Sequence, residues 1–153
     1  EEQGCDVDIL DAHLGGDTNE QALAHVRILF DKVNKIAKPY VLLSGGETTV
    51  KVLGDGLGGP NTQFMLQAAI ALNANPKIVA LSCDTDGIDG AGDNAGALIT
   101  PETLGRAEKL GLAPQDFLDN NDSYNFFKAL NDLIISGPTQ TNVNDYRAFL
   151  IMP

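Results

Sequence analysis

The residues with the clearest chemical potential are four aspartates at positions 84, 86, 89 and 93. Carboxylates at this spacing repel one another unless a cation, hydrogen-bond donors or solvent compensate their charge. Mg²⁺ is a suitable cation, because it binds one or two carboxylates together with several waters. An EF-hand is excluded, since glycine stands at the fourth place of the segment and Ala95 at the twelfth. The segment therefore predicts either a Mg²⁺ site at Asp84 and Asp86, or an exposed turn whose aspartates cap a helix.

A second candidate is the glycine-rich segment 54–59, which precedes Pro60 and an apolar run. A glycine loop that leads into a helix exposes backbone N–H groups to an anion, and the helix dipole favours negative charge there. We therefore expect the amides of Gly56, Gly58 and Gly59 to receive phosphate or carboxylate oxygens. The segment also matches the Gly-x-Gly-x-x-Gly fingerprint of dinucleotide binding, although a tight turn explains the glycines as well. It lacks Gly-Lys-Ser/Thr and so is not a P-loop of the usual type.

Further polar groups stand in two later segments. Residues 137–144 offer Thr139, Thr141 and Asn142 directly after an apolar run, and residues 120–123 offer amides and a hydroxyl. Turn and helix-cap chemistry is the alternative explanation for both. The two histidines are expected on the surface or on a helix face, and no Ser/His/Asp or Cys/His arrangement is apparent.

The elements that must position these residues alternate between strands and helices. Residues 41–43 and 48–52 predict a hairpin with a glycine turn at positions 45 and 46. Residues 78–81 form a compact apolar run, as in a strand covered on both faces. Further strands are expected near 7–10, 95–100, 133–135 and 146–152, and helices over 18–36, 60–72 and 100–110 and from 122 onward. The pattern predicts an α/β three-layer sandwich with a mixed, mostly parallel sheet. Ligands in such sheets bind beyond the strand ends, where the aspartate segment lies.

The amino-acid composition limits the kinds of partner that this chain is expected to bind. The chain has 153 residues, enough for one domain with a sizeable core, and 43% of them are hydrophobic. A formal charge of -11 argues against nucleic acid, which needs clustered Lys and Arg. The two cysteines are far apart, which fits a reducing cytoplasm better than a disulfide framework. No apolar run has the length of a membrane span, so no membrane partner is expected. The first residues read as the end of something longer, and we expect a fragment.

Several motifs together resemble the MOFRL domain, the C-terminal domain of the glycerate 2-kinase family, whose members are often labelled hydroxypyruvate reductase. The motifs are Ser44-Gly-Gly-Glu-Thr48, Gly58-Gly-Pro-Asn61, Asp84-Thr-Asp-Gly-Ile-Asp-Gly90, Asn120-Asn-Asp-Ser-Tyr124, Phe127 and Gly137-Pro-Thr-Gln-Thr-Asn-Val-Asn-Asp145. They run in family order from about Tyr40 to the C-terminus. Residues 1–39 are expected to be an entry strand and helix, and residues 40–153 the motif-bearing core of a single domain.

The resemblance implies a two-domain enzyme with its active site in the cleft between the domains. Such an enzyme transfers the γ-phosphoryl group of ATP to the 2-hydroxyl of D-glycerate and uses Mg²⁺. The partner would be an N-terminal Rossmann-like domain of the same chain, and a homodimer is possible. The fragment alone is expected to be inactive. Leu57 and Pro60 replace two arginines of the common family motif, and Thr62-Gln63 replaces Gln-Glu.

The residues and the resemblance together assign the site. Catalytic roles are expected for Glu47, Asn61, Asp86 and Asp89. Substrate or phosphate is expected to contact Ser44, Gly45, Gly46, Thr48, Gly56, Gly58, Gly59, Asn121, Ser123, Thr139, Thr141 and Asn142. Asp84 and Asp86 are the expected Mg²⁺ ligands.

Two other functions stay open at this point. The first is an oxidoreductase that acts on hydroxypyruvate with NAD(P)H, which the glycine fingerprint would serve. The second is a non-catalytic interaction domain. All these assignments require the glycines of the expected hairpin and the aspartate segment to meet in one pocket at one rim of the sheet, which opens toward a missing partner domain.

Overall fold

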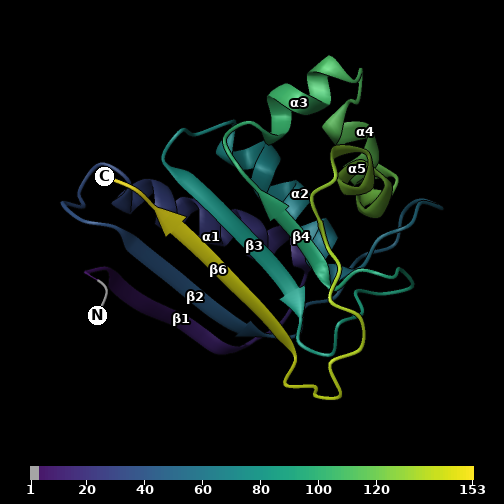
Figure 1. The fold of residues 1–153 in the computed structure, drawn as a ribbon, viewed down its shortest axis with the longest axis horizontal. Coiled ribbons are helices and arrows are strands. Elements are labelled where there is room, and N and C mark those ends of the chain that lie inside the picture. Colours follow the sequence, from purple (N-terminus) through teal and green to yellow (C-terminus); the bar gives the residue numbers. More distant parts are fainter. Residues whose placement is uncertain (1–3) are drawn as a thin grey trace.

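The fold is built on one six-stranded sheet, with strand order β1-β2-β6-β3-β4-β5 (Figure 1). The structure is a computed structural model that describes residues 4–153. Its strands are β1 (Asp6–Leu14), β2 (Tyr40–Gly46), β3 (Ile78–Asp84), β4 (Gly96–Ile99), β5 (Leu133–Ile134) and β6 (Asp145–Ile151). The chain thus returns at its end to place β6 in the middle of the sheet, between β2 and β3.

The strand pairing confirms a mixed sheet but not a mostly parallel one. β1 and β2 are parallel, whereas the β2–β6, β3–β6, β3–β4 and β4–β5 pairs are antiparallel. The expectation of a mostly parallel sheet is therefore wrong. The cause is the direction of β6 and of β4, each of which runs opposite to both of its neighbours, and the local sequence pattern does not indicate strand direction.

The expected hairpin around the glycines is also wrong. β2 continues through Gly45 and Gly46, which pair with Tyr146 and Asp145 of β6. Residues 47–59 form no named strand. Gly46 has a φ of 113°, and a Cβ on it would collide with the backbone of Leu14 in β1. These glycines therefore allow two strands to approach closely rather than turn the chain.

Five helices complete the described chain: α1 (Thr18–Lys32), α2 (Pro60–Leu72), α3 (Thr103–Lys109), α4 (Pro114–Asp119) and α5 (Ser123–Leu130). α4 was not expected from the sequence. Helix α1 begins after Asp17, whose carboxylate accepts from the N–H groups of Asn19 and Glu20. No helix of the described residues is long and apolar enough to span a membrane.

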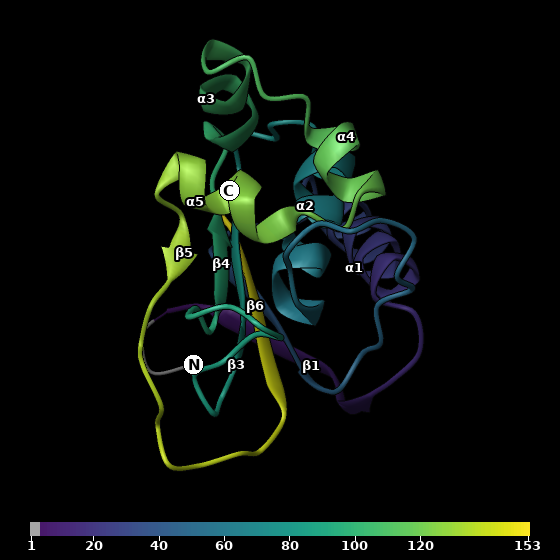
Figure 2. The same ribbon diagram turned by 90° about the vertical axis from the view of Figure 1, so that its right-hand side faces the viewer.

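The helices cover one face of the sheet. α1 and α2 pack behind the strands as seen in Figure 1, and α3, α4 and α5 gather beyond β4 at one edge (Figures 1 and 2). No helix of residues 4–153 lies over the opposite face of the central strands. The α/β class is confirmed, but the third layer of the expected sandwich is not formed by the described residues.

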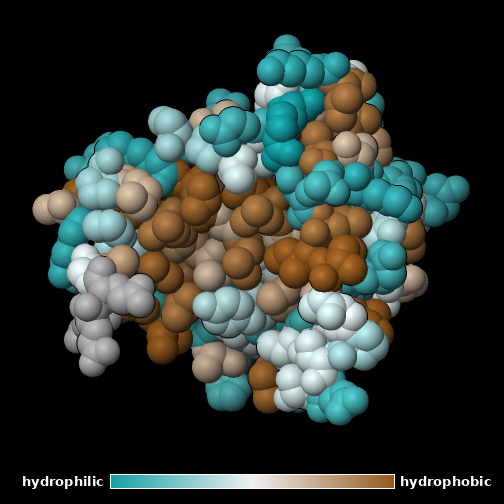
Figure 3. Space-filling view, viewed as in Figure 1, coloured by the Kyte–Doolittle hydropathy of each residue, from teal (hydrophilic) through white to brown (hydrophobic). Residues whose placement is uncertain are grey.

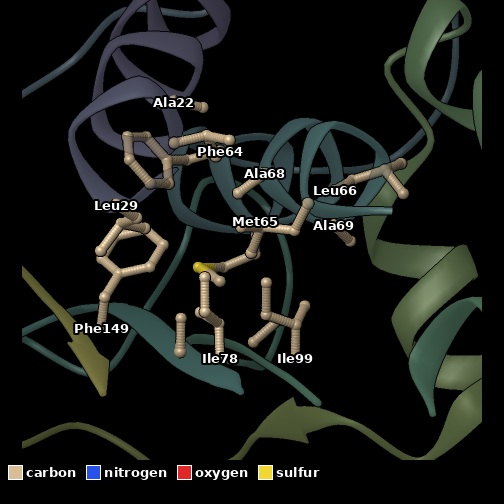
Figure 4. Close-up of a cluster of buried hydrophobic side chains, with 14 of the residues drawn as sticks. Ala22, Leu29, Phe64, Met65, Leu66, Ala68, Ala69, Ile78, Ile99 and Phe149 are labelled. Carbon is tan, nitrogen blue, oxygen red and sulfur yellow. The ribbon is translucent and has the colours of Figure 1, made fainter. Parts of the chain in front are cut away.

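The core lies between α2 and the sheet. Phe64, Met65 and Leu66 are each fully buried, which explains why the α2 sequence is apolar almost all round. Figure 4 shows Phe64 directed toward Leu29 of α1 and Phe149 of β6, and the two phenylalanine ring centroids lie 6.2 Å apart. Because α2 touches α1, the strands and the later helices, it fixes the position of the loop at its own N-terminus.

Candidate functional site

The polar loops meet at one rim of the sheet. Gly46 at the end of β2 pairs with Asp145 at the start of β6, and Asp84 at the end of β3 pairs with the same residue. The segments that follow β2 and β3 and the segment that precedes β6 therefore leave the sheet side by side. This rim is where sequence reasoning expected a site.

The aspartate segment and the segment before β6 are joined by hydrogen bonds. The Thr139 N–H donates to the carbonyl of Asp86 at 3.0 Å, and the Thr139 hydroxyl donates to the carbonyl of Thr85. The Thr85 N–H donates to the carbonyl of Asn144 at 3.2 Å. Asn142 Nδ2 lies 3.4 Å from Asp86 Oδ2. Two loops that lie far apart in the sequence thus form one unit.

The expected site residues separate into two groups by exposure. The side chains or backbone of the first group are open to solvent at least in part: Gly45, Glu47, Gly56, Gly58, Asp84, Asp86, Thr139, Thr141 and Asn142. The second group is buried: Ser44, Gly46, Thr48, Gly59, Asn61, Asp89, Asn121 and Ser123. Only the first group can meet a solute without rearrangement.

Asp84 and Asp86, the residues expected to hold Mg²⁺, each accept a hydrogen bond from a nearby backbone N–H. Asp84 Oδ1 accepts from the N–H of Asp86 at 2.9 Å, and Asp86 Oδ1 accepts from the N–H of Ile88 at 2.8 Å. Partial burial raises the pKa of Asp84, and the neighbouring carboxylates of Asp86 and Asp145 add to the rise. A cation would relieve this repulsion. The described residues hold no group of three or more His, Cys, Asp or Glu placed for a metal, so waters would supply the other Mg²⁺ ligands.

Asp89 has a different role from the other two. Its carboxylate is 2% exposed and accepts from the backbone N–H groups of Asn61 and Thr62, at 2.9 and 2.8 Å, and from the Thr62 hydroxyl. Burial raises its pKa, and these donors oppose the rise. Asp89 therefore caps the N-terminus of α2, which is the helix-cap alternative for this segment. Its position does not support the expected catalytic role.

The backbone N–H groups of the glycine segment 54–59 donate hydrogen bonds to other residues of this chain. The Gly54 N–H donates to Asn121 Oδ1, the Gly56 N–H to the carbonyl of Asn120, and the Gly59 N–H to the Thr62 hydroxyl. Because the amides of Gly56 and Gly59 already have partners, the structure does not support their expected contact with phosphate. Side chains on these glycines would collide with residues 120–123 or with Asp89, so close packing explains them.

A buried ion pair beneath the rim was missed from the sequence. Arg147 is fully buried, and its Nη2 donates to Asp145 Oδ2 at 2.6 Å and to Thr48 Oγ1 at 3.1 Å. Asp145 Oδ1 accepts from Asn61 Nδ2 at 2.7 Å. The Arg147 guanidinium carbon also lies 4.9 Å from the Phe64 ring centroid. The signal in the sequence was the alternation of β6, which places Arg147 on the same face as Phe149.

These contacts form a chain of buried polar groups from α1 to α5. The Thr18 hydroxyl donates to Thr48, and the Ser123 hydroxyl donates to Thr62, each at 3.0 Å. Between these ends stand Arg147, Asp145, Asn61 and Asp89. These buried polar side chains link the residues after β2, the N-terminus of α2 and the aspartate segment. The buried site residues therefore fix the positions of the exposed site residues.

His25 and Ser44 belong to the core. His25 is fully buried, with Nδ1 2.7 Å from the carbonyl of Gln21 and Nε2 2.9 Å from Ser44 Oγ. Since a carbonyl only accepts, Nδ1 carries the proton and Nε2 accepts from the Ser44 hydroxyl. Burial lowers the pKa of His25. Ser44 therefore faces the core and is not placed to meet a substrate, and His25 lies on the buried face of α1, which agrees with the helix-face alternative expected for it.

The fold and the rim define an α/β domain whose polar loops gather at one edge of a mixed sheet. The chain belongs to the MOFRL family, whose sequence model matches residues 40–145. This confirms the resemblance found in the motifs.

Similar proteins carry kinase and reductase names. The D-glycerate 2-kinase of Thermotoga maritima is 38% identical over 99% of this chain and 37% of its own length. A crystal structure of glycerate kinase (EC 2.7.1.31) from the same organism superposes with a TM-score of 0.93 at 38% identity, covering 98% of this chain and 37% of that one. A protein of Agrobacterium vitis named as an unproven hydroxypyruvate reductase is 55% identical over 74% of this chain and 30% of its own. The chain thus spans about a third of the length of these relatives.

Proposed function

We propose that this chain is the C-terminal domain of a glycerate 2-kinase, which transfers the γ-phosphoryl group of ATP to the 2-hydroxyl of D-glycerate. The observation that carries the proposal is the similarity to a D-glycerate 2-kinase over 99% of this chain. The meeting of the polar loops at one rim supports it, because a transferred group needs several side chains in one place. The proposal also places the protein in a reducing cytoplasm and includes the formation of a homodimer.

The exposed rim would supply the chemical contacts. Asp84 and Asp86 would hold Mg²⁺, which neutralises charge on the phosphoryl oxygens when it is bound. Glu47 is exposed directly after β2 and would orient the glycerate hydroxyls. The exposed side chains of Thr139, Thr141 and Asn142 would close the substrate site from the adjoining loop. The buried residues Asn61, Thr48 and Asp89 would not contact the substrate, and they would position the loops that carry the exposed side chains.

The site would be a cleft completed by an N-terminal Rossmann-like domain. Phosphoryl transfer relies on positive charge and donors aimed at the transferred group. At the rim the amides of Gly56 and Gly59 are engaged, and Leu57 and Pro60 contribute no charge. The missing donors would therefore come from the other domain, and the 153-residue chain alone would be inactive.

The decisive experiment uses the longer protein that contains this chain. We expect it to form ADP from ATP only when D-glycerate is present, with 2-phosphoglycerate as the product identified by NMR. Hydroxypyruvate with NADH or NADPH serves as the control reaction. The absence of phosphoglycerate from a folded longer protein would end the kinase proposal.

The reductase alternative is favoured only by the names of relatives such as the one from Agrobacterium vitis. Its structural basis would be the glycine fingerprint, in which a pyrophosphate sits at the helix N-terminus. Here the buried carboxylate of Asp89 takes that place on α2. A pyrophosphate would meet a like charge, so this loop does not favour nicotinamide binding. Quenching of NADH fluorescence by the longer protein would revive the alternative.

A further inference from the structure

The face of the sheet opposite α1 and α2 is apolar across five strands. Side chains in β2, β3 and β6 alternate between the helix-covered face and this second face. Strand register aligns the residues of the second face, which we call the open face: Val7, Ile9, Val41, Leu43, Gly45, Val79, Leu81, Cys83, Leu98, Tyr146, Ala148 and Leu150. Figure 3 shows hydrophobic side chains gathered over the central strands on this side.

The open face differs from the solvent side of an ordinary sheet. Antiparallel sheets with one side in water alternate apolar and polar residues, whereas strands covered on both sides are apolar throughout. None of the twelve residues of the open face is charged, although the chain carries 21 acidic residues. Ile9 is 71% exposed, Tyr146 42% and Leu98 38%. A continuous patch of this kind marks a surface that another element covers.

The dimensions indicate what kind of element fits. Five strands at about 4.8 Å spacing make a face about 20 Å wide. Two helices packed side by side at about 8–10 Å have that width. The two helices α1 and α2 cover the reverse side of the same sheet (Figure 2). In the same view residues 135–144 project beyond the sheet on the open side. That projection would obstruct the flat approach of a second sheet.

Two further observations select the source of the helices. The relatives that match this chain are about three times as long, so most of their polypeptide lies outside the matched region. A second copy of the chain would instead bring together two molecules that each carry a formal charge of -11.

We propose that the open face docks amphipathic helices contributed by the remainder of the longer polypeptide, which complete a three-layer sandwich. The inference rests on the part of the proposed function that makes this chain one domain of a longer protein, but not on the reaction. It assigns to that polypeptide a second contact with this domain, separate from the cleft at the rim.

The first test measures stability in the longer protein. Ile9→Lys and Leu98→Lys place charges on the open face, and Leu110→Lys is the matched control, because Leu110 is 58% exposed at the end of α3 on a different surface. We expect each open-face variant to lower Tm by at least about 5 °C, and the control to change it by less than about 1 °C. Equal Tm values for all three variants would overturn the proposal.

The second test does not depend on how well a charged variant folds. Single cysteines at Ile9, Leu98 and Leu110 are introduced into the longer protein with its other reactive cysteines replaced, and a bulky maleimide is added. We expect Ile9→Cys and Leu98→Cys to react at least about 100-fold more slowly than Leu110→Cys at every protein concentration. Equal rates would mean that the face is uncovered. Protection that disappears on dilution would identify a second copy, and either result overturns the proposal. Neither readout involves glycerate or ATP, so the kinase proposal is tested separately.

Discussion

At the scale of single residues, the acidic groups near the rim differ in how many donors surround them. Asp89 accepts from two backbone N–H groups, a hydroxyl and Asn61 Nδ2, and Asp145 accepts from Arg147 and Asn61. Asp84 accepts from one nearby backbone N–H, and Asp86 accepts from one backbone N–H and, at 3.4 Å, from Asn142 Nδ2. Buried charges persist when donors satisfy them, whereas carboxylates short of donors attract a cation. The sequence alone placed all the acids of the segment in one loop but could not separate these two classes.

The Mg²⁺ assignment predicts an effect of Asp86→Asn on the metal requirement of the longer protein. Removing one of two carboxylate ligands should raise the Mg²⁺ concentration for half-maximal activity about tenfold or more, because few protein ligands hold the ion. Asp93→Asn is the control, since Asp93 is exposed in the same loop and accepts from the Tyr124 hydroxyl. The measurement is activity against Mg²⁺ concentration. Unchanged kinetics in Asp86→Asn would favour a non-catalytic interaction domain.

The buried ion pair predicts a large loss of stability in Arg147→Met. Removing one partner leaves Asp145 charged in the interior, which costs about 3–5 kcal/mol. Arg106→Met is the control, because the Arg106–Asp132 pair is also short, at 2.6 Å, but its arginine side chain is 36% exposed and its aspartate side chain 10%. We expect a smaller loss in this variant, because solvent reaches one partner of the pair. Chemical denaturation gives both free energies of unfolding. Adding Asp145→Asn to Arg147→Met should restore part of the loss, and equal losses in the two arginine variants would contradict the assignment.

The buried histidine predicts a pH dependence of stability. Burial lowers the pKa of His25 in the folded state, while the unfolded chain has a pKa of about 6.5. The unfolded chain therefore binds the proton first, so the contribution of neutral His25 is complete above about pH 6.5 and is lost as pH falls through the folded pKa. His25→Gln should lose less stability than the parent between pH 7.5 and 5.5, as measured by urea unfolding. His13→Gln, at an exposed position, should keep the parent slope. The same slope in all three proteins would rule out this role.

At the scale of elements, strands and helices with strong periodicity were predictable and the glycine segments were not. The sequence placed α2 correctly from its apolar run after Pro60, and β3 from residues 78–81. It misread Gly45 and Gly46 as a turn, and it did not indicate that the segment 54–59 packs against residues 120–123. In both cases the glycine serves close packing against a segment far away in the sequence. Local pattern cannot report such a contact, because its cause is tertiary. The expected contact of the Gly58 amide with phosphate stays a prediction.

The packing role of the glycine segment predicts that Gly56→Ala is destabilising even without any ligand. A Cβ on Gly56 would meet Asp122 and the backbone carbonyl of Asn120, which cannot rotate away. Overpacking of this kind costs about 1–3 kcal/mol. Gly105→Ala is the control, because no atom lies within 4 Å of its added Cβ and it stands inside α3, where alanine should stabilise by about 0.5–1 kcal/mol. If Gly56 served only to bind phosphate, its substitution would leave unfolding unchanged and affect affinity alone.

At the scale of the whole molecule, the sequence predicted the neighbourhood of the site but not the route of the chain. Asp84, Thr139 and Gly46 were expected at one rim. Strand register brings Asp84 and Gly46 there, and the hydrogen bond from the Thr139 N–H to the carbonyl of Asp86 adds Thr139. The direction of β6 and the bare face of the sheet depend on how the chain returns, which periodicity does not encode. The motif order was enough to identify the family without that topology.

The molecule as a whole predicts that binding and turnover separate when the domain is isolated. The 153-residue chain holds both proposed Mg²⁺ ligands, so it should bind Mg²⁺ weakly by calorimetry, and Asp86→Asn should abolish that binding. It should form no phosphoglycerate from ATP and D-glycerate, because the amides at Gly56 and Gly59 are engaged and the donors for the phosphoryl group would lie in the other domain. The assay compares the chain alone, the upstream domain alone, their mixture and the joined protein at equal concentration. Turnover by the chain alone would show that the donors lie within these residues, and the cleft proposal would fail.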